Sequence, residues 1–123
     1  VAARVPIERL AAHFHDTYGQ ALANLFAVLQ LGVAVIDSSV AGLGGCPYAP
    51  GASGNVNSEE LAHMFACMGV ETGVALSPLL DVVGALPRLV GRALQNQLLA
   101  AGPRLRTHPA PDWLDERFGK SQA

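Results

Sequence analysis

The feature that limits the fold of this chain most is a pair of short strand patterns with a helical pattern between them. Residues 10–15 alternate apolar and polar side chains, and residues 33–36 form a continuous apolar run rich in β-branched residues. Such a run is typical of strands buried on both faces in parallel sheets. Between the two, residues 18–31 place apolar side chains at helical spacing and stop at Gly32. Strand, helix and strand in this order predict parallel β/α units, so we expect an α/β fold.

A long glycine-rich loop is expected after the second strand. It spans residues 41–57 and holds five glycines, two prolines, a cysteine and a tyrosine. Loops of this length inside a compact domain are usually functional. Asn57 or Ser58 is placed to cap the following helix, with Glu60 in position for a capping box. That helix is expected to run to about residue 68.

The rest of the chain predicts further helices and then an irregular tail. Ser77 and Pro78 resemble a helix cap followed by a first-turn proline. The helical pattern continues to about residue 99, with a break expected at Pro87. Residues 101–123 are rich in proline and weakly periodic, which predicts an irregular tail with at most a turn around residues 113–118.

Composition excludes some classes of function. Half of the 123 residues are apolar, which suggests surfaces normally covered by more protein, and the missing initiator Met indicates truncation or processing. The net charge is −2 without a basic block, so non-specific nucleic-acid binding is not expected. No apolar stretch approaches the ~20 residues of a membrane span. Cys46 and Cys67 form no CxxC pair, so a structural zinc site is not indicated, and free thiols in a reduced compartment are favoured over a disulfide.

Two histidines stand at the end of the first strand pattern. His13 and His15 are two residues apart, so on a strand both imidazoles point to the same face and can meet one cation. The alternative is a pair of solvated or core histidines. Their position at the end of a strand and just before a helix favours a cation site, because catalytic groups of parallel barrels lie at the carboxyl ends of the strands.

Further candidates lie in and beside the glycine-rich loop. Cys46 could act as an acid, base or nucleophile, although a glycine-rich segment alone could be a linker. Cys67 falls in a helical pattern and is interpreted as a packing residue. Asn55 could bind a cation or form an Asx turn. Asp37 ends the second strand and could be catalytic or support another residue.

These motifs resemble one family closely. The segments HFHD at residues 13–16 and GLGGCPYAPGASGN at residues 42–55 are similar to the last two β/α units of the 3-hydroxy-3-methylglutaryl-CoA lyase family. The first motif is shared with a wider metallolyase superfamily of synthases and aldolases. The Cys-Pro-Tyr segment is more specific, because those related synthases and aldolases lack it in this loop. The resemblance implies that residues 1–100 are the C-terminal segment of a (β/α)8 TIM barrel with extra C-terminal helices, and that residues 101–123 lie outside the family pattern.

The resemblance also implies a metal site and a catalytic group. The family's remaining metal ligand, an aspartate after its first strand, and a neighbouring arginine have no counterpart in this chain. The expected cofactor is a divalent cation, Mg²⁺ or Mn²⁺. The expected catalytic residues are Cys46, His13 and Glu59, the expected metal ligands are His13, His15 and Asn55, and the expected supporting residues are Asp16 and Asp37.

The implied reaction is cleavage of 3-hydroxy-3-methylglutaryl-CoA to acetoacetate and acetyl-CoA. The partner is then an acyl-CoA substrate, without nucleic acid or membrane, and a homo-oligomer is left open. Another aldolase or acyl-CoA lyase of the superfamily and an inactive truncated product remain alternatives. The expected location is the cytoplasm of a bacterium, or the mitochondrial matrix in a eukaryote.

Overall fold

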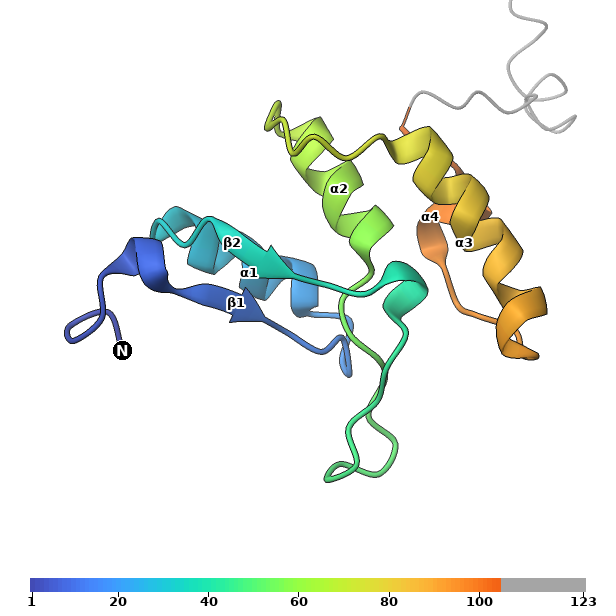
Figure 1. Ribbon diagram of the computed structural model, residues 1–123, viewed down its shortest axis with the longest axis horizontal. Helices are drawn as coiled ribbons and strands as arrows, with labels where there is room; N and C mark the ends of the chain where they lie inside the picture. Colours follow the sequence, from blue (N-terminus) through green and yellow to red (C-terminus); the bar gives the residue numbers. More distant parts are fainter. Residues whose placement is uncertain (105–123) are drawn as a thin grey trace, which may run out of the picture.

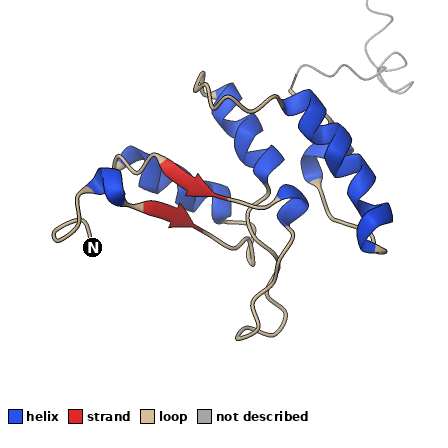
Figure 2. Cartoon of the chain, viewed as in Figure 1, coloured by secondary structure: helices blue, strands red, loops and turns tan. Residues whose placement is uncertain are grey.

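In the described part of the chain, the helix α1 (Ala21–Gln30) lies against one face of two parallel strands, and three further helices lie beyond the carboxyl ends of the strands (Figures 1 and 2). The structure, a computed structural model, describes residues 1–104. The elements in chain order are η1 (Ile7–Arg9), β1 (Ala11–His13), α1 (Ala21–Gln30), β2 (Val35–Asp37), η2 (Val40–Gly42), α2 (Ser58–Cys67), α3 (Leu76–Val90) and α4 (Gln97–Ala101).

The strands β1 and β2 pair in parallel and are joined by α1. Their register sets Ala12 against Ile36 and His13 against Asp37. A parallel pair needs a crossover connection, and α1 supplies it. The α/β class and the parallel β/α arrangement predicted from the sequence are therefore confirmed.

Both strands differ in extent from the sequence prediction. β1 ends at His13, and His15 lies beyond it in an isolated antiparallel bridge to Asn55. β2 begins at Val35, two residues later than expected, and the exposed fraction of Val35 is 56%. The prediction of a strand buried on both faces is wrong for the described residues, because they leave Val35 uncovered.

The helix caps also differ. Gly19, with a φ of 68°, lies in the turn before α1, and α1 begins at Ala21 instead of residue 18. Asn57 is the N-cap residue of α2 but makes no side-chain cap hydrogen bond. The expected capping box is absent there, because the Glu60 carboxylate accepts a hydrogen bond from the Gln97 N–H at 3.2 Å.

The helix α3 is continuous through Pro87, so the predicted break at that residue is wrong. It starts after Ala75, which places Ser77 inside the helix and not at its cap. Pro87 stands in the last turn, and the helix ends one turn later at Gly91, whose φ of 69° is left-handed. The predicted turn at residues 113–118 and most of the predicted tail lie outside the described residues.

The core joins both halves of the described chain. α1, α2 and β1 contribute to it, and so does the segment that returns from the glycine-rich loop. Within residues 1–104, no helix has the length and apolarity to cross a membrane. The buried members of the core are Ala12, Ala21, Leu25, Val33, Val56, Leu61 and Phe65.

Candidate metal centre and active-site loop

The returning segment of the glycine-rich loop is held between the two strand extensions. Val56 donates its N–H to the Phe14 carbonyl at 3.1 Å, and Asp16 donates to the Gly54 carbonyl at 3.0 Å. On the other side, Ser39 donates to the Val56 carbonyl at 3.1 Å. This segment therefore extends the sheet beyond the ends of β1 and β2, and Asn55 is placed opposite His15.

Glycines allow the two ends of the loop to touch. A β-carbon on Gly54 would lie 1.7 Å from the Gly42 carbonyl oxygen, and one on Gly44 would lie 2.5 Å from Asn55 Nδ2. Such distances are below any non-bonded contact, so these positions require glycine. By contrast, Gly45 has open space around it. The loop thus has a tightly packed stem, formed by Gly42, Gly44, Gly54 and Asn55, and an open tip.

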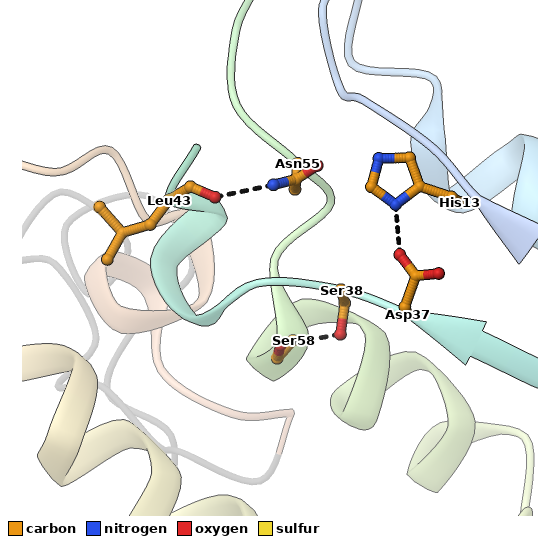
Figure 3. A network of polar contacts seen from close by, with 6 residues as sticks. All are labelled: His13, Asp37, Ser38, Leu43, Asn55 and Ser58. Carbon is orange, nitrogen blue, oxygen red and sulfur yellow. Dashed lines mark hydrogen bonds and ion pairs between the residues drawn. The ribbon is translucent and has the colours of Figure 1, made fainter. Parts of the chain in front are cut away.

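The structure brings the three predicted metal ligands to one place. The ring centroids of His13 and His15 are 5.2 Å apart. Asn55 reaches the same region from the loop stem, where its Nδ2 donates to the Leu43 carbonyl at 2.8 Å (Figure 3). His13 Nδ1 contacts the Asp37 carboxylate, which orients the ring (Figure 3). Asp37 therefore lies where a residue supporting a metal-bound histidine would be needed.

Two atoms of this group are buried without a partner. His15 Nδ1 and Asn55 Oδ1 have no hydrogen-bond partner among the described residues. Buried polar atoms are almost always paired, so these two neighbouring atoms are free to bind a water molecule or an ion. Imidazole nitrogen and amide oxygen both bind divalent cations. The residues present therefore fit a cation, although the part of the chain that the structure covers has no cluster of three His, Cys, Asp or Glu side chains able to hold a metal.

The expected catalytic and supporting residues are spread around this centre. Cys46 is half-buried at the start of the loop tip, and Tyr48 is exposed there. Asp16 accepts a hydrogen bond from the Ala21 N–H at 2.8 Å, so its side chain fixes the start of α1. Glu59 is fully buried, and its carboxylate contacts the backbone of Ala41 and the side chain of Asn96.

Cys67 does not pack as predicted. Both cysteines are free, but Cys67 is exposed, and its Sγ lies 3.7 Å from His63 Nε2 on the next turn of α2. The same His63 nitrogen accepts a hydrogen bond from the Arg104 N–H at 3.2 Å. The interpretation of Cys67 as a packing residue is therefore wrong, because this face of α2 is open.

A polar cavity lies beside the loop stem. It has a volume of about 630 Å³ and extends to the segment between α3 and α4. Sequence patterns did not predict this cavity, because the residues that line it are distant from one another in the chain. Its lining includes Asp16, Asn55, Glu60 and Arg92.

Solved structures that share this fold are lyases, and they place the chain in the TIM-barrel class of α/β proteins. An HMG-CoA lyase from Acinetobacter baumannii, solved with coenzyme A and 3-methylmalate, matches 89% of the chain with a TM-score of 0.82 and 39% identity. The hydroxymethylglutaryl-CoA lyase of Pseudomonas aeruginosa matches 82% of the chain with a TM-score of 0.76 and 51% identity. The model of the HMGL-like family matches residues 1–85, and the chain belongs to this family.

Curated relatives agree with the motif resemblance. A P. aeruginosa 3-hydroxy-3-isohexenylglutaryl-CoA/hydroxy-methylglutaryl-CoA lyase is 55% identical over 76% of the chain. The mitochondrial hydroxymethylglutaryl-CoA lyase of Gallus gallus is 50% identical over 85% of it. The chain spans about a third of the length of these relatives, with 31% and 35% of each covered.

Proposed function

We propose that this chain is the C-terminal part, the last two β/α units, of a lyase that cleaves 3-hydroxy-3-methylglutaryl-CoA to acetoacetate and acetyl-CoA. Residues 1–100 would belong to the barrel and its added helices, and residues 101–123 to a tail. The observation that carries the proposal is the pair of buried, unpartnered atoms, His15 Nδ1 and Asn55 Oδ1, beneath a loop that bears Cys46. Family membership supports the same reaction class.

The metal ligands in this proposal are His13, His15 and Asn55. A bound Mg²⁺ or Mn²⁺ would supply Lewis-acid polarisation and a template for the substrate oxygens. Asp37 fixes the ring of His13 through Nδ1, and the packed stem fixes Asn55. Asp16 supports the group indirectly, because its N–H binds Gly54 and its carboxylate binds the start of α1.

Cys46 would handle a proton during cleavage. Its Sγ belongs to the loop tip, next to a stem that the strand extensions hold in place. A tip that closes over the substrate would exclude water and bring the thiol to the reacting carbon. His13 belongs to the catalytic group as a residue of the cation site. Glu59, the third residue expected to be catalytic, lies buried beside the start of the loop.

The polar cavity beside the stem offers room for the acyl-CoA. Arg92 lines it and carries a positive charge suited to an anionic group of that substrate. The relative that is named for an isohexenylglutaryl-CoA supports a second candidate, a lyase for a longer acyl-CoA of the same type. The proposed location is the cytoplasm of a bacterium, or the mitochondrial matrix in a eukaryote.

One assay tests the activity and separates the two substrates. The complete polypeptide that carries these residues is incubated with Mn²⁺, a thiol reductant and 3-hydroxy-3-methylglutaryl-CoA, and the acetoacetate released is measured. A parallel reaction uses the isohexenyl analogue. Metal-dependent release from the first substrate supports the leading proposal. Cleavage of the analogue alone selects the second candidate, and no cleavage of either contradicts both.

A further inference from the structure

The glycine-rich loop begins with an unusual backbone turn. Ala41 has a φ of 53° and a ψ of 26°, and Gly42 follows with a φ of 63°. A left-handed conformation is disfavoured for any residue with a β-carbon, by about 1–2 kcal/mol. Such a residue persists only where its surroundings hold it. Contacts to Ala41 therefore determine the direction in which the loop leaves η2.

Glu59 provides those contacts. Its carboxylate accepts the Ala41 N–H through both oxygens, each at 3.1 Å, and its exposed fraction is 0%. A buried carboxylate is costly unless hydrogen bonds satisfy it. The Ala41 N–H thus stabilises the buried Glu59 carboxylate, and the carboxylate in turn restrains the backbone at Ala41.

Asn96 adds a second donor from a distant part of the chain. Its Nδ2 contacts Glu59 Oε1, while its Oδ1 accepts the Leu99 N–H at 2.6 Å and caps α4. The neighbouring Gln97 N–H binds Glu60 at 3.2 Å. α4, which packs against α2 and α3, is therefore attached at two points to the first turn of α2 (Figure 1).

We propose that Asn96 and Glu59 are positioning residues that set the start of the loop bearing Cys46. Asn96 orients the Glu59 carboxylate, and Glu59 holds the left-handed turn at Ala41. Neither residue needs to touch the substrate. The consequence for catalysis rests on the proposed function, but the effect on the loop does not.

Hydrogen exchange of the loop amides tests the proposal in the complete polypeptide that carries these residues. Asn96→Asp keeps the acceptor that caps α4 and turns the donor into a second carboxylate facing Glu59. We expect the amides of residues 41–45 to exchange roughly tenfold faster or more, because hydrogen bonds to a charged group are lost. Amides of α1 should keep their rates. The matched control is Gln97→Ala, which retains the Gln97 backbone N–H and should leave residues 41–45 unchanged.

A double variant distinguishes positioning from general destabilisation. In Asn96→Asp with Glu59→Gln, the new amide can donate to Asp at position 96 and its oxygen can still accept the Ala41 N–H. The hydrogen bond between the two side chains forms again with donor and acceptor exchanged. The exchange rates of the amides of residues 41–45 should therefore return to within about threefold of the parent rates. If Asn96→Asp does not fold, Asn96→Ser replaces it, because serine caps a helix but lacks the reach of the amide.

The outcomes separate this inference from the proposed function. Fast loop exchange in the single variant with recovery in the double variant supports it, and a parallel fall and recovery of kcat at unchanged Mn²⁺ affinity extends it to catalysis. Unchanged loop exchange in the single variant overturns it, as does acceleration spread evenly over α1 and the loop. A parent protein without lyase activity that shows the expected exchange pattern contradicts the proposed function alone.

Discussion

Gly54 and Gly42 lie backbone against backbone, so close that a β-carbon on Gly54 would fall 1.7 Å from the Gly42 carbonyl oxygen. This contact closes the stem of the loop. On one side of it Asn55 faces His15, and on the other Ala41 binds Glu59. The proposed metal site and the start of the loop are therefore adjacent to one glycine contact.

Gly54→Ala should destabilise the stem strongly. The added methyl cannot be accommodated without backbone movement, and overpacking typically costs about 1–3 kcal/mol or more. Gly45→Ala is the matched control, because a β-carbon there meets nothing within 4 Å. Denaturant unfolding of the complete polypeptide measures both. Equal stability of the two variants would contradict the packed stem.

Removing a metal ligand should weaken cation binding far more than removing another histidine. We expect His13→Ala and His15→Ala to lose Mn²⁺ affinity by at least about 100-fold, and Asp37→Asn by about tenfold because it only orients His13. His63→Ala is the control, since His63 lies on α2 and its ring contacts Cys67 of the same helix and the backbone N–H of Arg104, which follows α4. Titration with Mn²⁺ followed by electron paramagnetic resonance gives the affinities. Binding of parent strength in His15→Ala would rule out the site.

Cys46→Ser should lower turnover sharply and leave Mn²⁺ affinity nearly intact, because the thiol is on the loop tip and not among the ligands. Cys67→Ser is the control and should retain turnover. Steady-state rates and Mn²⁺ titrations on the same preparations check this. A large loss of metal affinity in Cys46→Ser would instead make the thiol a ligand.

Alkylation should label Cys67 at least as fast as Cys46. A glycine-rich loop is usually open and a helix face is usually packed, which would favour Cys46, but the structure has Cys67 exposed and Cys46 half-buried. Peptide mapping after brief treatment with iodoacetamide measures the order. Exclusive early labelling of Cys46 would show that the face of α2 bearing Cys67 is covered in the complete protein.

Residues 1–123 alone should be inactive and marginally folded. Their metal centre has three candidate ligands, the described part has only two strands, and Val35 stays exposed. Isolated two-stranded sheets are marginally stable at best. Acetoacetate release by this segment, compared with a complete lyase, is the measurement. Turnover near that of the complete enzyme would mean that several copies assemble one site.

Local patterns predicted much of the fold. The alternating pattern that ends near His13 and the apolar run before Asp37 placed these two side chains at the ends of two parallel strands, as observed. His15 was expected on the same strand but lies beyond it, in a bridge to Asn55. The glycine-rich segment was recognisable because glycine is required wherever backbones touch. Strand lengths and burial were mispredicted: both strands are three residues long, and the described residues leave Val35 exposed.

Long-range contacts were not predictable in the same way. Asparagine is a common helix-capping residue, so Asn96 could be predicted to cap α4. The residues next to it in the sequence do not indicate that its side chain contacts Glu59. Glu59 resembles an acidic residue near the catalytic site of the family, but its burial and its contact with Ala41 could not be predicted from neighbouring residues. Pro87 suggested a break, yet the helix continues to Val90 because a proline near a helix end interrupts few hydrogen bonds.

The bridge between His15 and Asn55 has a topological consequence. A cation bound to both would act as a cross-link, closing the intervening chain, with α1, β2 and the whole loop, into a ring. Only the folded chain holds the two residues together, since closing a ring of that length in the unfolded chain costs conformational entropy, so the ion binds the folded state. The ion would then stabilise the sheet and the loop stem together, so the melting temperature of this region would rise with the concentration of free cation.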